Sequence, residues 1–200
     1  MRIMRLGIWM VAIMSCLLLA ACSQSGEPEE KTAAQLAADG WKAYSAHDYQ
    51  TAASTFAEAI GKDGNLVDGY DGAGWANAKL DSLTAAVSNF RTGMNKDSLN
   101  LEIKAGLSLV YNAQENYSGS ILLASVVIRS NSAWSFSHDA SVGASSLRLL
   151  LAEDYFALAE YDLSLQQVQV LNPSFTADVS TVKGQGAVGQ EIERLRGILG

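Results

Sequence analysis

Residues 33–66 read AAQLAADGWKAYSAHDYQTAASTFAEAIGKDGNL, and residues 67–100 read VDGYDGAGWANAKLDSLTAAVSNFRTGMNKDSLN. When the second stretch is laid on the first, the landmarks coincide: Gly40 with Gly74, Trp41 with Trp75, Ala52 with Ala86, and Phe56 with Phe90. A period of this length is typical of stacked helix pairs, in which each pair covers the apolar face of the next. The two stretches therefore predict an all-α solenoid, which is a shape that binds partners along a surface.

Each repeat contains two segments whose apolar and small residues recur every three or four positions, as on one face of a helix. In the first repeat these residues are Leu36, Gly40 and Ala43, followed by Ala52, Phe56 and Ala59. Asp48 stands where it can cap the second helix. Glycine inside a helix costs about 1 kcal/mol relative to alanine. Its return at Gly74 therefore predicts that the paired helices pack too closely for a larger side chain.

This pattern resembles the tetratricopeptide repeat, whose signature combines small residues, an aromatic residue and phenylalanine at fixed places. Gly40, Tyr49, Ala52, Phe56 and Ala59 match it closely, and Gly74, Leu83, Ala86, Phe90 and Gly93 match it more loosely. A third repeat over residues 101–134 keeps Tyr111 and Tyr117. The resemblance implies a tetratricopeptide-type solenoid of about four helix pairs.

The fourth repeat, at about residues 145–173, follows an insertion. Tyr161 comes later after Tyr117 than one repeat length allows, and the excess falls in the Ser-rich stretch 129–145. Pro173 should end the fourth pair. Together the repeats make one domain, residues 33–173.

Residues 174–200 are expected to form a loop over 174–185 and a helix over 187–199. Val188, Ile192, Leu195 and Leu199 share one face of that helix. A solenoid needs its last apolar face covered, so we interpret this helix as a cap. The alternative is a dimerisation helix.

The chain begins with Arg2 and Arg5, followed by an uncharged run over residues 6–19. This order is typical of a signal peptide, here residues 1–21. Leu19-Ala20-Ala21-Cys22 resembles the bacterial lipobox, which implies lipid attachment to Cys22 and a flexible tether over residues 22–32. Ser23 then implies a lipid-anchored protein of the cell envelope, at the outer membrane in bacteria that have two membranes. The alternative is an ordinary secretory signal with a chance cysteine.

Charge and cysteine content exclude several classes of function. Removing residues 1–21 takes away two of 14 basic residues and no acidic one, which leaves a formal net charge of −9. Such a surface repels nucleic acid and favours a basic partner. Since Cys16 leaves with the signal and Cys22 is capped by lipid, no disulfide or cysteine metal site is expected.

Two motifs that suggest cofactors or metals lack the context that they require. Gly184, Gly186 and Gly189 spell G-x-G-x-x-G, but the stretch after them, residues 190–200, is too short to complete a βαβ unit. Residues 63–69 (DGNLVDG) resemble a calcium loop with the wrong ligand spacing, and we interpret them as a turn. His47 and His138 fit no metal spacing. No metal, no cofactor and no enzymatic activity are expected.

The tetratricopeptide resemblance implies that ligands contact the first helix of each pair. Transferred position by position, it assigns a partner-binding groove to Trp41, Tyr44, Asp68, Asp71, Trp75, Lys79, Leu109 and Asn112. Tryptophan and tyrosine are common binding anchors, and the aspartates would attract a basic partner. The alternative is that Trp41 and Trp75 are core residues. The insertion, with Trp134 and Phe136, is a second candidate site.

These expectations combine into a membrane-anchored, non-catalytic scaffold that holds a protein or peptide partner on the concave face of the repeats. The alternative function is a glycan- or solute-binding lipoprotein that uses exposed tryptophans. An enzyme ranks last among the three.

Overall fold

The computed structural model describes residues 30–199, and in this part of the chain it contains nine helices and no strand. Their bounds are α1 Ala33–Ser45, α2 Tyr49–Lys62, α3 Val67–Lys79, α4 Leu83–Lys96, α5 Leu101–Ala113, α6 Tyr117–Ser130, α7 Ala144–Ala157, α8 Tyr161–Leu171 and α9 Val182–Leu199. The predicted signal peptide, Cys22 and the tether up to residue 29 lie outside the described residues. Within them, no helix has the length and apolar character needed to cross a membrane.

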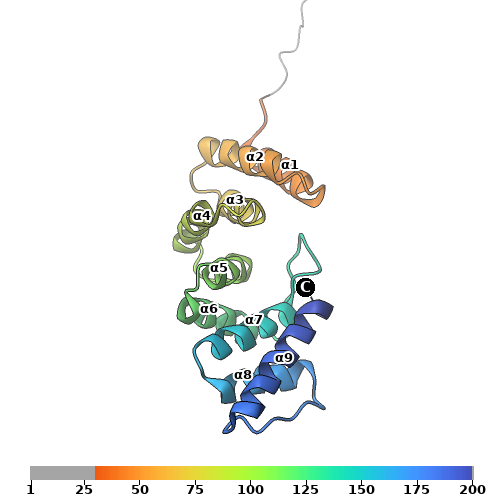
Figure 1. The fold of residues 1–200 in the computed structure, drawn as a ribbon. Coiled ribbons are helices and arrows are strands. Elements are labelled where there is room, and N and C mark those ends of the chain that lie inside the picture. Colours follow the sequence, from red (N-terminus) through yellow and green to blue (C-terminus); the bar gives the residue numbers. More distant parts are fainter. Residues whose placement is uncertain (1–29, 200) are drawn as a thin grey trace, which may run out of the picture. The chain divides into compact units, whose positions relative to one another are not determined.

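Four antiparallel helix pairs stack in chain order, with α9 against the last pair (Figure 1). The first helices of successive pairs, α1, α3, α5 and α7, touch one another, whereas the second helices α2, α4, α6 and α8 do not. The first helices therefore lie on the inside of the stack, and we call the surface that they form the inner face. This arrangement confirms the predicted all-α solenoid with four pairs and a terminal helix.

Each of the first two pairs encloses a phenylalanine between glycines of two successive first helices. A Cβ atom on Gly40 or Gly72 would lie 2.8 or 2.1 Å from the Phe56 ring, which is far inside van der Waals contact. Phe90 is enclosed in the same way by Gly74 and Gly106, one repeat further along the chain. The expected need for small residues at Gly40 and Gly74 is confirmed, and the structure adds a second glycine to each site.

The short turns inside the pairs share one backbone feature. His47, Asp81, Glu115 and Ala159 each adopt a positive φ, between 56° and 61°. Before the second helix, Asp48 accepts a hydrogen bond from the Thr51 N–H at 3.1 Å, as predicted for an N-cap. The left-handed residue thus closes every helix pair, although a different residue type occupies it each time.

We expect Ala159→Gly to stabilise the protein by about 1 kcal/mol, because alanine pays a steric cost in the left-handed conformation that glycine avoids. The measurement is the midpoint of urea unfolding. Ala57→Gly is the matched control, because Ala57 is exposed within α2, where glycine should destabilise by a similar amount. A loss of stability on Ala159→Gly would contradict this account.

The last helix differs from the prediction in its start. It begins at Val182, before the expected Ala187, because Thr181 Oγ1 accepts a hydrogen bond from the Gly184 N–H at 3.0 Å. A Cβ on Gly184 would lie 1.9 Å from the carbonyl oxygen of Asp178, so this glycine serves a close backbone contact inside the helix. Residues 182–185, which were expected to belong to the loop, are therefore helical.

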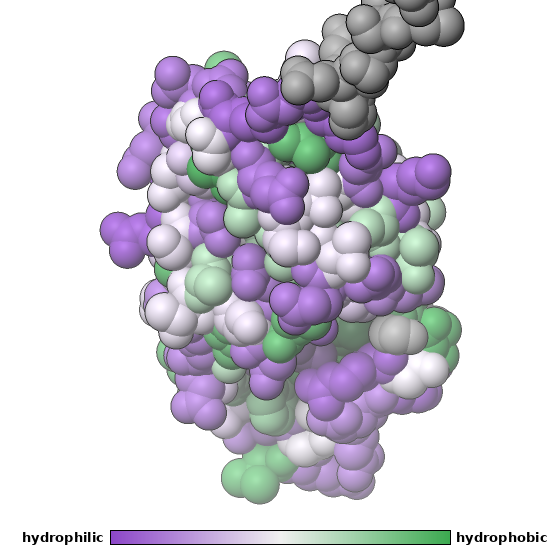
Figure 2. Space-filling view, turned by 90° about the horizontal axis from the view of Figure 1, so that it is seen from above, coloured by the Kyte–Doolittle hydropathy of each residue, from purple (hydrophilic) through white to green (hydrophobic). Residues whose placement is uncertain are grey.

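Helix α9 covers the open end of the stack, as predicted for a cap. Its buried residues join those of α7 and α8 in a small cluster made of Leu149, Ala152, Val168, Val188, Ile192 and Leu195. The rest of the core is one large cluster running from α1 to α7. Viewed from the α1–α2 end, the surface is mostly hydrophilic, with hydrophobic residues in small separate patches (Figure 2).

Candidate functional site on the inner face

Aromatic side chains gather on the inner face where α1 and α3 lie side by side. Trp41 and Tyr44 come from α1, one turn apart, and Trp75 comes from α3. The indole N–H of Trp41 donates a hydrogen bond to Asp68 Oδ1 at 2.8 Å, which links the two helices. The residues predicted from two separate repeats are thus brought together at one place.

This cluster is covered by the chain itself, through the α6–α7 segment, residues 131–143. Other pairs are joined by the much shorter stretches 63–66 and 97–100, so this segment contains most of the predicted insertion. Its hairpin-like base is closed by hydrogen bonds from the Phe136 N–H to the Val142 carbonyl (2.9 Å) and from the Ala144 N–H to the Trp134 carbonyl (2.7 Å). The segment folds back over α5 toward α3 and α1 (Figure 1).

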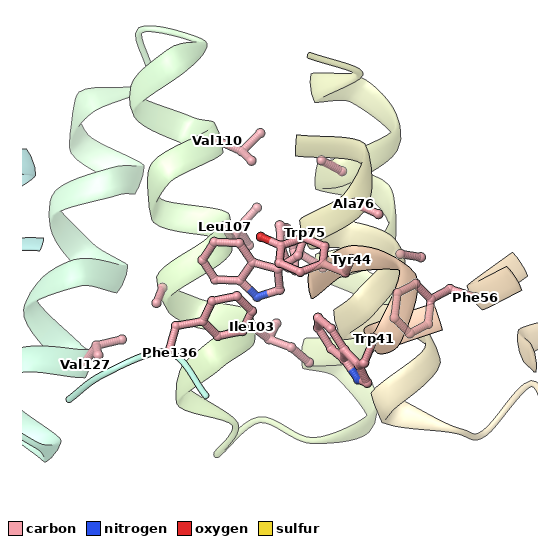
Figure 3. Packing of buried hydrophobic residues seen from close by; sticks show 14 of the residues in the cluster. Trp41, Tyr44, Phe56, Trp75, Ala76, Ile103, Leu107, Val110, Val127 and Phe136 are labelled. Atoms are coloured by element: carbon pink, nitrogen blue, oxygen red, sulfur yellow. The ribbon is translucent and has the colours of Figure 1, made fainter. Parts of the chain in front are cut away.

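Two rings of the α6–α7 segment stack on the two predicted tryptophans. The Phe136 ring lies on Trp75 with centroids 4.1 Å apart and planes 18° apart. The His138 ring lies on Trp41 with centroids 3.6 Å apart and planes 2° apart. Figure 3 shows the Phe136 ring against Trp75, with Trp41 and Tyr44 close by. Such ring pairs contribute energy beyond the area that they bury.

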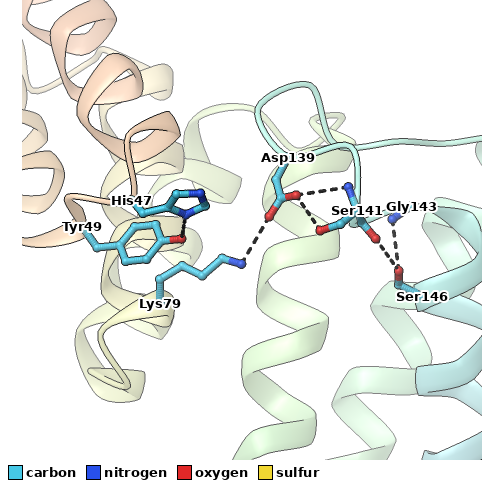
Figure 4. Close-up of polar contacts among 7 residues, drawn as sticks. All are labelled: His47, Tyr49, Lys79, Asp139, Ser141, Gly143 and Ser146. Carbon is cyan, nitrogen blue, oxygen red and sulfur yellow. Dashed lines mark hydrogen bonds and ion pairs between the residues drawn. The ribbon is translucent and has the colours of Figure 1, made fainter. Parts of the chain in front are cut away.

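Polar contacts hold the tip of the segment at the edge of the cluster. Lys79 Nζ and Asp139 Oδ2 form an ion pair at 3.3 Å, and Ser141 donates hydrogen bonds to the same aspartate (Figure 4). The backbone N–H of Ser137 donates to Glu102 Oε1 at 3.1 Å. The segment therefore contacts helices of three successive repeats.

The expectation of an open aromatic groove is corrected by this arrangement. Trp41, Tyr44, Asp71 and Trp75 keep only 7, 2, 3 and 2% of their surface exposed, because the repeats and the α6–α7 segment cover them. Their role in binding a partner stays a prediction. Of the other groove residues, Asp68 and Lys79 are exposed, whereas Leu109 and Asn112 are half-buried.

Three buried polar atoms of the cluster have no hydrogen-bond partner: Tyr44 Oη, Asp71 Oδ1 and Trp75 Nε1. Burial, followed by the charges of Glu102 and Asp68, raises the pKa of Asp71 well above its usual range. The nearby Trp75 N–H partly offsets this shift without forming a hydrogen bond of normal geometry. Asp71 is therefore not the accessible negative charge that the sequence suggested.

Asn112 belongs to a different polar group, further along the stack. Its Nδ2 donates to Asp154 Oδ1 at 2.7 Å, joining α5 to α7. Burial raises the pKa of Asp154 to about 6, although the nearby Ser120 hydroxyl and the Asn112 amide oppose the shift. We assign Asn112 a structural role, because its side-chain amide is used inside the protein.

The cover over the tryptophans was not predicted, although Trp134 and Phe136 were singled out. Trp134 and Phe136 are buried, His138 is half-buried, and Ser135 and Ser137 between them are exposed. Alternation of this kind is typical of an extended segment with one buried face. It indicates that the stretch packs against something, but it does not identify the surface. No group of three or more metal-ligating side chains is found among residues 30–199.

No protein-family model and no curated protein matches this sequence. Among solved structures, the chain is similar to MamA of AMB-1 with a TM-score of 0.61 and 16% identity, over 82% of this chain and 80% of that one. MamA of MSR-1 gives the same TM-score and identity, over 82% and 84%. A tetratricopeptide repeat protein of Parabacteroides merdae has a TM-score of 0.58 and 12% identity, over 82% of this chain and 60% of that one. These likenesses show that the chain has a tetratricopeptide-type fold.

Proposed function

We propose that this protein is a non-catalytic protein-interaction scaffold that binds a protein or peptide partner on the inner face of its repeats. The observation that carries the proposal is the tetratricopeptide-type stack, whose first helices form one continuous inner face on which Asp68 and Lys79 are exposed. Trp41, Tyr44 and Trp75 lie on the same face but are buried by the repeats and the α6–α7 segment, so they become binding anchors only where that segment is displaced.

We further propose that the scaffold is held at the membrane of the bacterial envelope, at the outer membrane in bacteria with two membranes. The support is the lipobox-like stretch ending at Cys22 together with the polar residues after it. A folded unit that starts at Thr32 leaves about ten residues between Cys22 and the first repeat, enough to reach roughly 35 Å when extended. The acidic net charge favours a basic partner.

The rival function is binding of a glycan or solute to exposed tryptophans. Trp41, Trp75 and Trp134, the three tryptophans among residues 30–199, are all buried. A sugar that stacks on an indole ring needs an open ring face, so this arrangement supports the rival less. Quenching of tryptophan fluorescence by glycan fragments would favour it.

Position-specific photo-cross-linking in cells that make the full chain tests the scaffold. A photoreactive residue at Lys79 or Leu109 reports on the inner face, and one at Glu58, exposed on the outer helix α2, is the matched control. We expect one defined protein band from the inner positions and none from Glu58. The same cells carrying Cys22→Ala should lose the protein from the membrane fraction, whereas Cys16→Ala should retain it.

Two results would count against the proposal. Cross-links from Glu58 alone would move the partner to the outer helices. Retention of the Cys22→Ala chain at the membrane would remove the lipid anchor, while leaving the protein-binding part of the proposal intact.

A further inference from the structure

The α6–α7 segment is an addition to a stack that is already complete beneath it. Its first residues keep the turn that joins other pairs: Asn131 Oδ1 accepts from the Ala133 N–H as Asp63 Oδ1 accepts from the Asn65 N–H. The segment departs from the repeat at Trp134. Helices α6 and α7 still pack directly on each other, as α4 and α5 do. The packing of α6 on α7 is therefore direct and does not pass through residues 134–142, although Trp134 and Phe136 join the main core.

The segment contacts the inner face as an extended ligand would. Phe136 is 1% exposed and stacks on Trp75, while His138 stacks on Trp41. These contacts come from alternate residues, with the intervening serines facing outward. The ion pair from Asp139 to Lys79 then fixes the position along the face. The chemistry of the stretch is aromatic, small, aromatic, small, histidine and carboxylate.

The fit is incomplete in one respect. Tyr44 Oη, Asp71 Oδ1 and Trp75 Nε1 remain without hydrogen-bond partners in this covered cluster. A buried polar atom left unpaired costs free energy that a well-placed donor or acceptor recovers. A peptide that offers the same rings together with such groups would gain hydrogen bonds that the internal segment does not make.

We propose that residues 134–139 are an internal ligand of the inner face, and that the partner displaces them with an extended segment of the same chemistry. This inference rests on the proposed scaffold function and specifies its binding site. The partner segment presents aromatic side chains at alternate positions over Trp75 and Trp41, followed by a carboxylate for Lys79. With the internal ligand in place, the site is closed to other extended segments.

The first test uses the unmodified residues 30–200, which contain the compact unit that starts at Thr32. Native-state hydrogen exchange would compare the amides of Phe136, Val142 and Ala144, all hydrogen-bonded at the base of the segment, with buried amides of α3 and α5. We expect at least 100-fold less protection in the segment, because it opens without unfolding the repeats. Equal protection in both places would overturn the proposal.

The second test measures binding of a synthetic peptide with the sequence of residues 132–142, SAWSFSHDASV. A chain carrying Phe136→Ala and His138→Ala should bind the peptide at least tenfold more tightly than the unmodified chain. A peptide with the same two substitutions is the matched control and should not bind. Equal binding to both chains would show that the internal segment does not occupy the peptide's site, and would overturn the proposal.

A covalent lock separates this proposal from the proposed function. Lys79→Cys with Asp139→Cys places the only two cysteines of residues 30–200 on the two sides of the ion pair, and a bifunctional thiol reagent with a reducible linker replaces the length of the lysine side chain. The cross-linked chain should lose peptide binding, and reduction of the linker should restore it. If the locked chain still cross-links its partner from Leu109, the internal ligand is wrong and the scaffold stands. If no inner position cross-links any protein in the unlocked chain, the scaffold itself is wrong.

Discussion

Gly72→Ala is expected to lower the free energy of unfolding by about 3 kcal/mol, the upper end of what overpacking costs. The added Cβ would lie 2.1 Å from the Phe56 ring, and 2.2 and 2.5 Å from two other atoms of the same ring. Phe56 cannot retreat, because it is fully buried and Gly40 closes its other side. The helices α2 and α3 would have to separate. Urea unfolding followed by circular dichroism measures the loss.

Gly61→Ala is the matched control for this experiment. Gly61 lies in α2 with no atom within 4 Å of an added Cβ, so the same substitution should stabilise by about 1 kcal/mol through helix propensity alone. Phe56→Leu removes the ring that the added Cβ of Gly72→Ala would strike. The double variant Gly72→Ala/Phe56→Leu should therefore lose less stability than the two single variants lose together. If Gly72→Ala behaved like Gly61→Ala, the packing between the first two pairs would differ from that described here.

The protein should be more stable at pH 5 than at pH 7.5, by about 2 kcal/mol. Burial raises the pKa of Asp154 to about 6, and burial with neighbouring carboxylates raises the pKa of Asp71 well above its usual range. A carboxyl group with a raised pKa binds its proton more tightly when folded. The stability that this tighter proton binding contributes is fully present below the pKa of the carboxyl group in the unfolded chain. It is lost as pH rises through the pKa of the same group in the folded protein. Urea midpoints measured across this range test the sign.

Asp154→Asn should raise stability at pH 7.5 and flatten the pH dependence. The asparagine keeps an oxygen for the Asn112 amide and brings an amide toward Ser120, whose hydroxyl has no partner. Asp48→Asn is the control. Hydrogen bonds from Thr51 lower the pKa of Asp48, so this group changes its protonation below pH 5. Asp48→Asn should therefore leave the difference in stability between pH 5 and pH 7.5 unchanged. Stability that increased toward pH 7.5 would contradict the protonated state of the buried carboxyls.

The repeat architecture was predictable because its causes are local in sequence. The spacing of Phe56 and Phe90, with Gly40 and Gly74 one helix earlier, follows from rings that need room on the facing helix. The insertion before α7 was located in the same way, from the break in phase between Tyr117 and Tyr161. The spacing of the repeats carries no information about contacts made by residues that lie outside them. The early start of α9 was therefore missed, because the need for Gly184 arises from the Asp178 carbonyl and not from a turn.

The sequence predicted the first-helix residues of the candidate site, but it did not predict the segment that covers them, and it included Asn112, which belongs to a different polar group. Homologous positions placed Trp41 and Trp75 on first helices, and the structure brings them to one cluster. It also places Phe136 and His138 over them, so the groove is occupied. Those contacts join the first two repeats to a segment that follows the third repeat. Residues so far apart along the chain share no local sequence pattern that would predict their contact. The left-handed residues of the turns, such as His47 and Ala159, were also not predicted. The backbone conformation of the turn recurs in each pair, but the residue type at this position does not.

The amino-acid sequence alone determined that helix pairs of similar length stack, because apolar faces at helical spacing can be buried only against their neighbours. Only the tertiary structure decided what lies on the inner face, because an irregular segment takes its position from the surface that receives it. In this protein that surface is the pair of tryptophans from two repeats, and residues 134–139 of the same chain cover it.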